Sequence, residues 1–166
     1  MAETAFKGNP VNTSGDLPAV GSAAPAFSLT GGDLGAVTSE SLAGGRVVLN
    51  IFPSIDTPVC AQSVRAFNER AASMAGTTVV CVSADLPFAA GRFCEAEGIE
   101  NVTTGSTFRN PEFGDDYGVV IGEGPLSGLC ARAVVVIGAD GTVLHSELVP
   151  EITHEPDYDA ALATLG

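Results

Sequence analysis

One cysteine, Cys60, occupies a position in this sequence that suits nucleophilic chemistry. It ends the segment P-S-I-D-T-P-V-C, which follows an apolar run and precedes a pattern typical of an amphipathic helix. Pro58 suits a first helical position, and either Asp56 or Thr57 suits the N-cap, so Cys60 is expected to be the third residue of the first turn. Unpaired N–H groups and the positive end of the helix macrodipole favour an anion in that turn. The segment therefore predicts a cysteine that can act as a thiolate.

A thiolate at a helix start needs further groups around it to support a fast reaction. Bringing a thiol pKa from about 8.5 to about 6 requires roughly 3.4 kcal/mol, whereas a helix terminus supplies about 0.3 to 2 kcal/mol. A cationic or hydrogen-bonding partner is therefore needed. Because nucleophilicity falls with the pKa, this shift raises the rate only about two- to threefold. Most of the rate must come from groups that align the second reactant and stabilise the departing oxygen.

Two residues close to Cys60 could contribute to such a pocket. Thr57 lies three positions earlier, where its hydroxyl can point toward the thiol. Pro53 ends the preceding apolar run and removes a backbone donor, so it would shape a wall of the loop. Asp56 suits a helix start but would repel a neighbouring thiolate, and the sequence leaves its direction open.

The elements that must position these residues follow from apolar periodicity and from the Gly and Pro residues. Alternating buried strands and helices, closed by a hairpin and a last helix, indicate an α/β architecture with a central mixed sheet flanked by helices. This arrangement resembles the thioredoxin-like fold, and we expect residues 1–166 to form one domain. The expected elements are an N-terminal hairpin over 4–13 turning at Gly8-Asn9, a pair over 25–38 turning at Gly31-Gly32, strands 46–52 and 77–84, helices 58–74, 86–98 and 156–165, and a hairpin over 132–149 turning at Asp140-Gly141.

Composition excludes several classes of function. Seven Lys and Arg residues against 20 Asp and Glu residues give a net charge of -13, which disfavours nucleic acid and anionic membranes. The sequence shows neither a signal peptide nor an apolar stretch of about 18 residues, so a cytoplasmic protein is expected. His145 and His154 lack metal-ligand spacing with any cysteine, so we expect no metal and no other cofactor.

The segment around Cys60 resembles a known active-site motif. P-S-I-D-T-P-V-C matches the P-x-x-x-T-x-x-C motif of the peroxiredoxins, and SIDTPVCAQSVRAFNERAA closely resembles their thiol peroxidase subfamily, the atypical two-cysteine peroxiredoxins. The resemblance continues through SADLPFAAGRFC and ARAVVVIGADG and covers nearly the whole chain. It implies an enzyme that reduces hydrogen peroxide and alkyl hydroperoxides.

The resemblance also implies roles for individual residues and partners. Cys60 would be the peroxidatic cysteine, Thr57 would hydrogen-bond the peroxide and the thiolate, and Arg132 would complete the pocket. Cys94 would resolve the sulfenic acid into an intramolecular disulfide. Because both cysteines are expected on the apolar sides of their helices, we hypothesise that local unwinding precedes this bond. Thioredoxin would be the reductant, and the protein would be a homodimer whose interface lies close to the active-site loop.

Alternatives remain open from the residues themselves. Cys60 could be a small buried hydrophobe, and Arg132 could form an ion pair at a strand end. Cys81 is expected to be structural, whereas Cys130 could be inert or could compete for the sulfenate. Leu86, Ala90 and Phe93 indicate that the helix side carrying Cys94 faces the core, and Arg92 and Arg109 are expected to be surface charges.

Two other functions use the same kind of thiolate. A thioredoxin-like thiol-disulfide oxidoreductase would normally place a second cysteine two or three residues away, yet the sequence shows V-C-A-Q. A non-catalytic redox sensor would oxidise Cys60 slowly and transmit the signal to a partner. Peroxide turnover separates these alternatives from a peroxidase.

Overall fold

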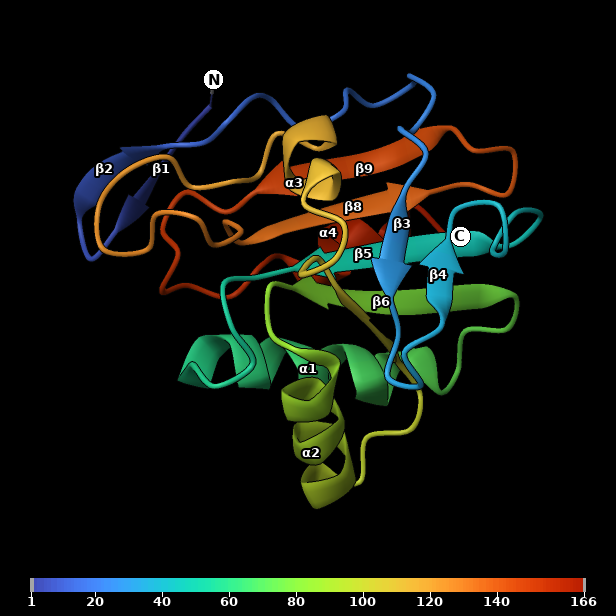
Figure 1. Ribbon diagram of the computed structural model, residues 1–166. Helices are drawn as coiled ribbons and strands as arrows, with labels where there is room; N and C mark the ends of the chain where they lie inside the picture. The colour runs from blue at the N-terminus through green and yellow to red at the C-terminus, as the bar shows by residue number, and fades with distance from the viewer. Residues whose placement is uncertain (1, 166) are drawn as a thin grey trace.

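The computed structural model describes residues 2–165 and contains a mixed seven-stranded sheet with a separate two-stranded hairpin (Figure 1). The strand order in the sheet is β4-β3-β7-β6-β5-β8-β9. The strands are β1 (Glu3–Phe6), β2 (Asn9–Asn12), β3 (Ser28–Thr30), β4 (Ala36–Thr38), β5 (Arg46–Ile51), β6 (Thr77–Ser83), β7 (Thr103–Ser106), β8 (Ala133–Ile137) and β9 (Val143–Leu148). The helices are α1 (Pro58–Ala71), α2 (Pro87–Glu97), α3 (Glu112–Asp116) and α4 (Tyr158–Ala163).

The centre of the sheet combines parallel and antiparallel pairs. β6 pairs parallel to both β5 and β7, whereas β8 runs antiparallel to β5 and continues through a hairpin into β9. The middle strands are apolar along almost their whole length because both faces of the sheet are covered. The expected α/β architecture with a central mixed sheet, flanking helices and an N-terminal hairpin is confirmed.

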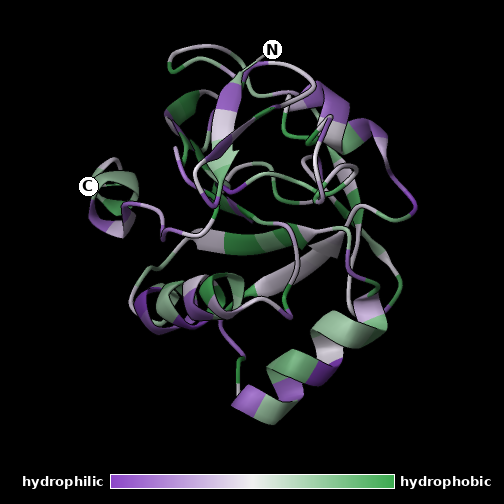
Figure 2. Cartoon of the chain, turned by 90° about the vertical axis from the view of Figure 1, so that its left-hand side faces the viewer, coloured by the Kyte–Doolittle hydropathy of each residue, from purple (hydrophilic) through white to green (hydrophobic). Residues whose placement is uncertain are grey.

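Successive side chains of a strand point to opposite faces of the sheet, so the apolar core is divided between these two faces. On one face, Val48 and Val134 pack with residues of α1 and α4. On the other face, Leu49 and Val135 pack against the chain around Phe27 and against α3. Figure 2 shows that the helices carry both hydrophobic and hydrophilic residues, as expected for elements with one face against the sheet and one in solvent.

The two long helices differ slightly from the expected ranges. Pro58 and Pro87 each occupy the first turn, but α1 ends at Ala71, so Met74 lies beyond the helix. Leu86 was expected to face the core, and this expectation is wrong because its side chain is 51% exposed. It occupies the N-cap position of α2, outside the helical face that Ala90 directs inward.

The N-terminal hairpin turns one residue earlier than the expected Gly8-Asn9 pair. Phe6 pairs with Asn9, so Lys7 and Gly8 form the turn with φ values of 51° and 81°. Both values lie in the left-handed region, which a two-residue hairpin turn of this kind requires. The pair β3–β4 and the hairpin β8–β9 form where their glycine-containing turns predicted them.

Two elements between residues 99 and 131 were not expected from the sequence. β7 has the sequence TTGS, which contains no apolar run. Its extended conformation depends on pairing with β6 and β3. α3 is only five residues long and includes Gly114. Neither has a local periodic signal long enough to distinguish it from a loop. Among residues 2–165, none of the helices has the length and apolar character needed to cross a membrane.

Candidate active site

Cys60 lies in the first turn of α1 with its thiol in contact with a buried guanidinium group. The Nη2 group of Arg132 donates a hydrogen bond to Cys60 Sγ at 3.1 Å, and the Nε group donates to the carbonyl of Ile152 at 2.8 Å. The exposed fractions are 0% for Cys60 and 1% for Arg132. A cation therefore contacts the sulfur in surroundings from which most water is excluded, where electrostatic stabilisation of a thiolate is strong.

The sheet topology explains how two residues 72 positions apart meet. The antiparallel register pairs Ala133, the first residue of β8, with Ile51, the last residue of β5. Arg132 precedes β8 and therefore lies at the edge of the sheet where β5 ends. The chain leaves β5 at this same edge and descends to the start of α1, as Figure 1 shows. Cys60 is thus brought to Arg132 by strand pairing.

A pocket of about 270 Å³ opens beside this pair. Most of its wall is apolar, and Arg132 is among the few polar residues that line it. The Nη1 group of Arg132 has no hydrogen-bond partner among the described residues, so it is free to donate to a bound molecule. The lining residues are Phe6, Lys7, Pro53, Thr57, Pro58, Val59, Leu126, Leu129, Arg132, Ile152 and Thr153.

Thr57 occupies the N-cap position of α1 without capping the helix through its side chain. Its hydroxyl instead donates to the carbonyl of Ser54 at 3.0 Å, within the loop that forms one wall of the pocket. Pro53 lies at the start of this loop and contributes to the same wall. The side chain of Asp56 is 69% exposed, and its carboxylate is 3.8 Å from Arg92, so its charge is directed to solvent.

None of the four cysteines is among the residues that line this pocket, and Cys60 is linked to it through its contact with Arg132. Cys94 is half-buried on α2 and packs against the same apolar cluster that contains Cys60, but the two cysteines are not joined by a disulfide. Burial raises the pKa of the Cys94 thiol. Burial also raises the pKa of Cys81 and of Cys130 to about 12 each, and both side chains are only 3% exposed.

Two acidic residues that support the loops of the site were not singled out from the sequence. Asp85 accepts hydrogen bonds from Ser54 and from the backbone of Ile55, and Glu151 accepts from the backbones of Lys7 and Gly8. Asp85 could have been identified from the sequence, because it follows the buried strand expected over residues 77–84. Residues that follow neighbouring parallel strands lie together at one end of a sheet. Glu151 had no comparable signal. Within residues 2–165, no cluster of three or more His, Cys, Asp or Glu side chains could hold a metal ion.

Comparison with known proteins decides the family. A model of the Redoxin family matches residues 19–162. A thiol peroxidase of Mycobacterium tuberculosis (strain H37Rv) is 64% identical over 166 residues, which cover 100% of this chain and 99% of that protein. The chain belongs to the thiol peroxidase family. A thiol peroxidase of Corynebacterium glutamicum is 58% identical over 165 residues and covers 99% of both chains.

A solved structure agrees with this family membership. The crystal structure of a peroxiredoxin-like protein from Aquifex aeolicus superposes with a TM-score of 0.94 at 43% identity, covering 99% of this chain and 96% of that chain. Membership of the thiol peroxidase family makes the chain an enzyme, an oxidoreductase that reduces peroxides with thiols. The alternatives of a dithiol oxidoreductase and of a non-catalytic sensor are not supported by these relatives.

Proposed function

We propose that the enzyme reduces hydroperoxides through Cys60, with Arg132, Thr57 and Pro53 forming the reaction pocket. The observation that supports this assignment best is the 3.1 Å hydrogen bond from Arg132 Nη2 to Cys60 Sγ beside an open pocket. The sequence required a cationic partner for a helix-start thiolate, and Arg132 has the charge and the reach to act as one.

In the first step, the Cys60 thiolate attacks the terminal oxygen of a hydroperoxide, ROOH. An S–O bond forms while the O–O bond breaks, and the departing alkoxide takes up a proton to leave as ROH. Cys60 becomes a sulfenic acid. The Nη1 group of Arg132 would donate to the peroxide oxygens. The hydroxyl oxygen of Thr57, whose own proton is donated to the Ser54 carbonyl, would accept from the hydroperoxide O–H. Together these contacts align the O–O bond with the sulfur, and Arg132 stabilises the developing charge.

In the second step, Cys94 resolves the sulfenic acid. Its thiolate attacks the Cys60 sulfur, the S–O bond breaks, and one water is released as the disulfide forms. A dithiol protein of the thioredoxin class then reduces this disulfide and leaves with its own disulfide. The two sulfurs come from different helices and must approach to about 2.05 Å, so we expect the start of α1 and the part of α2 around Cys94, near its C-terminal end, to unwind locally between the two steps.

The lining of the pocket supports alkyl hydroperoxides as substrates beside hydrogen peroxide. Phe6, Leu126, Leu129 and Ile152 surround the approach to Arg132 with apolar surface. An alkyl chain would bury its own apolar surface against them, at roughly 25 cal/mol per Å² removed from water. Hydrogen peroxide gains nothing from these contacts. We therefore expect KM to be lower for an alkyl hydroperoxide than for hydrogen peroxide.

Peroxide consumption coupled to thioredoxin and its reductase tests the assignment. A Cys60→Ser variant should lose turnover, whereas Cys94→Ser should react once with peroxide and then fail to cycle. Cys130→Ala is the matched control and should turn over like the parent. A Cys60→Ser variant that consumed peroxide as fast as the parent would contradict the proposal. A dominant Cys60–Cys130 disulfide after one equivalent of peroxide would instead exclude Cys94 as the resolving residue.

We further propose that residues 1–166 act as a single domain within a cytoplasmic homodimer. One continuous sheet organises the apolar clusters on its two faces, which supports a single folding unit. Four free cysteines suit a reducing compartment such as the cytoplasm. Exposed apolar side chains at Leu86, Phe88 and Phe108 offer a surface for a second copy close to the loop that contains Thr57.

A further inference from the structure

We propose that Asp85 is the positioning residue of the peroxidatic loop, defined here as residues 53–57. Its carboxylate holds this loop in the conformation that presents Cys60 to peroxide, and it must release the loop before Cys60 can reach Cys94. Asp85 would thus favour the first step of the reaction and oppose the second. The inference rests on the proposed function, because it assigns opposite effects to the two proposed steps.

The carboxylate of Asp85 accepts three hydrogen bonds. Its Oδ1 accepts from the hydroxyl of Ser54 at 2.8 Å. Its Oδ2 accepts from the backbone N–H of Ile55 at 2.7 Å and from the hydroxyl of Ser83 at 2.7 Å. Hydrogen bonds to an ionised carboxylate are shorter and stronger than those between neutral groups. The peroxidatic loop is therefore attached to the end of β6 through one charged side chain.

The attachment extends from Ser54 to the catalytic cysteine. The carbonyl of Ser54 accepts hydrogen bonds from both the backbone N–H and the hydroxyl of Thr57, at 3.2 Å and 3.0 Å. The carbonyl of Thr57 in turn accepts from the backbone N–H of Ala61, in the first turn of α1. Fixing Ser54 therefore orients both the Thr57 hydroxyl and the helix start that carries Cys60.

Asp85 also lies at the start of the second cysteine-bearing helix. It precedes Pro87, the first residue of α2, by two positions, and its own carbonyl accepts from the Ser106 hydroxyl at 2.5 Å. One residue thus links the beginning of α1, the beginning of α2 and the ends of β6 and β7. Any unwinding that brings the two cysteine sulfurs together must displace the peroxidatic loop from this carboxylate.

The ion pairs that link α2 to α1 and to the peroxidatic loop are exposed. Arg92 lies 3.8 Å from Asp56 with side chains 73% and 69% exposed, and Arg65 pairs with Glu97 with side chains 45% and 35% exposed. Solvent screens such pairs, so they add little to the energy that separates the folded and unwound loops. The hydrogen bonds of Asp85 are less exposed and are the larger barrier to release.

Asp85→Asn tests the inference by stopped-flow kinetics of the two steps. An amide keeps one acceptor oxygen but places an NH2 group where Oδ2 accepts from two donors. We expect sulfenic acid formation to slow about tenfold, equivalent to about 1.4 kcal/mol, because the pocket is no longer preorganised. We expect disulfide formation to become several-fold faster, because the loop is released more easily. Oxidation to sulfinic acid at high peroxide concentration should fall accordingly.

Asp140→Asn is the matched control. Asp140 lies in the turn between β8 and β9 at the opposite end of the sheet, and its Oδ1 accepts from the Thr142 backbone at 3.0 Å. This variant should change neither rate. Ser54→Ala removes one of the three hydrogen bonds and keeps the carboxylate, so it should shift both rates in the same directions as Asp85→Asn but less, and it replaces that variant if Asp85→Asn does not fold.

Opposite effects of Asp85→Asn on the two rates, slower sulfenic acid formation and faster disulfide formation, distinguish a positioning role of Asp85 from a purely structural one. A variant that slows both steps equally, or that leaves disulfide formation unchanged, would overturn the inference. Failure of the underlying function has a different signature, since the parent enzyme itself would then form neither a sulfenic acid nor a disulfide at Cys60. Mass spectrometry of the parent after one equivalent of peroxide separates the two results.

Discussion

At the scale of single residues, the arrangement around Cys60 shows why a buried arginine is tolerated in the core. Arg132 is 1% exposed and contacts a sulfur and a carbonyl. Desolvation of a guanidinium is costly unless an anion compensates it. The Cys60 thiolate can provide that anion, so the stability of the buried cation and the reactivity of the thiol are coupled.

Arg132→Met tests the coupling of stability and activity. Methionine fills similar volume, but it removes only one partner of the buried Arg132–Cys60 pair, which destabilises the fold when the other partner stays charged. Reaction with peroxide should also slow about 10²- to 10³-fold, because a donor that stabilises the transition state is lost. Thermal unfolding and stopped-flow peroxide reduction measure the two effects. Arg70→Met, at the far end of α1, is the control, and an equal loss of activity in both variants would contradict the role of Arg132.

Cys81 and Cys130 should resist alkylation in the folded protein. Burial raises the pKa of each thiol from 9.0 to about 12, so the thiolate fraction at neutral pH falls about a thousandfold. Mass spectrometry after brief iodoacetamide treatment should find Cys81 and Cys130 unmodified in the native protein and modified only after unfolding. Rapid labelling of Cys130 in the native protein would instead support the alternative in which Cys130 competes for the sulfenate.

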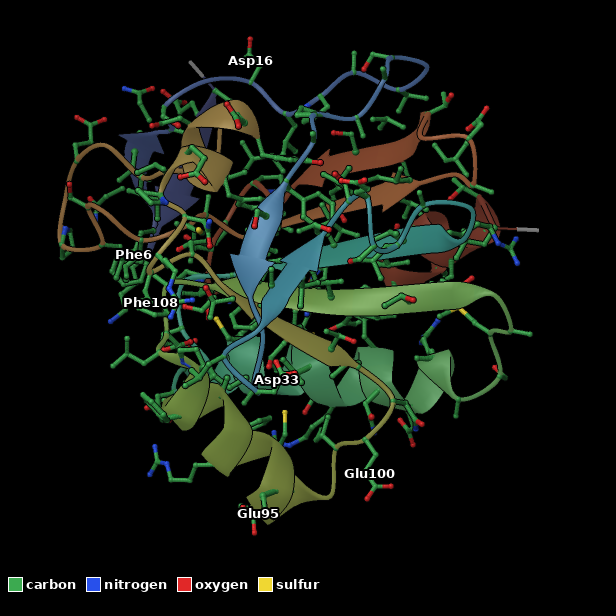
Figure 3. The ribbon with its side chains drawn as sticks, turned by 45° about the vertical axis from the view of Figure 1, so that its right-hand side comes forward. Phe6, Asp16, Asp33, Glu95, Glu100 and Phe108 are labelled. Atoms are coloured by element: carbon green, nitrogen blue, oxygen red, sulfur yellow. The ribbon has the colours of Figure 1, made fainter. Side chains whose placement is uncertain are left out.

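At the scale of elements, the N-terminal hairpin is attached to the loop that follows β9. Glu151 accepts hydrogen bonds from the backbones of Lys7 and Gly8 at the hairpin turn, at 3.2 Å and 2.8 Å. Phe6 and Lys7 line the candidate pocket together with Ile152, whose N–H donates to the Ala5 carbonyl and whose own carbonyl accepts from Arg132. Figure 3 shows Phe6 and Phe108 on the same side of the molecule, so the hairpin and the loop after β7 both border this region.

Acid should weaken this attachment. Hydrogen bonds from the backbone of Thr153, and then from Gly8, Thr153 Oγ1 and Lys7, lower the pKa of Glu151 from 4.5 to about 2. A lowered pKa in the folded state stabilises the protein above the unfolded-state pKa, and this contribution is lost as the pH falls from about 4.5 toward 2. Thermal unfolding from pH 7 to pH 2 should therefore show a smaller acid-induced loss in Glu151→Gln than in the parent.

Glu100→Gln provides the comparison for this pH series. Glu100 is exposed on the loop after α2, far from the hairpin, as Figure 3 shows. The variant should follow the parent at every pH. A parent and Glu151→Gln variant with parallel pH profiles would show that the hairpin turn does not depend on this carboxylate.

At the scale of the whole molecule, a high negative charge and an exposed apolar surface act in opposite directions on self-association. The net charge of -13 repels a second copy, whereas Leu86, Phe88 and Phe108 are 51%, 70% and 44% exposed. The hydrogen bond from Ser106 to the Asp85 carbonyl joins the two segments that carry these side chains. The two segments that carry these exposed apolar side chains are therefore adjacent near the peroxidatic loop.

Phe88→Asp should shift the proposed dimer toward monomer. The change removes the most exposed aromatic contact and adds a charge to an already acidic protein, and higher salt should partly restore association by screening that repulsion. Sedimentation equilibrium at two ionic strengths measures both effects. Val20→Asp, at an exposed apolar residue in another region of the chain, is the control. Equal dissociation constants for the parent and Phe88→Asp would exclude this surface as the interface.

The sequence by itself determined the elements with strong local signals, and it singled out Cys60 as the candidate nucleophile. Long apolar runs predicted β5, β6 and β8, Pro58 predicted the start of α1, and a motif with fixed spacing indicated Cys60. The charge arithmetic at a helix start also required a cationic partner. β7 and α3 escaped prediction because they are short and depend on neighbours distant in the sequence.

Only the tertiary structure decided how the candidate site is assembled. Strand register brings Arg132 to Cys60, and the meeting of β6, β7 and the loop after β5 brings Asp85 to Ser54. No local pattern encodes these contacts, because each joins side chains separated by 31 to 72 positions. The exposure of Leu86 was decided in the same way, since the packing of α2 on the sheet, and not its periodicity alone, determines which residues meet solvent.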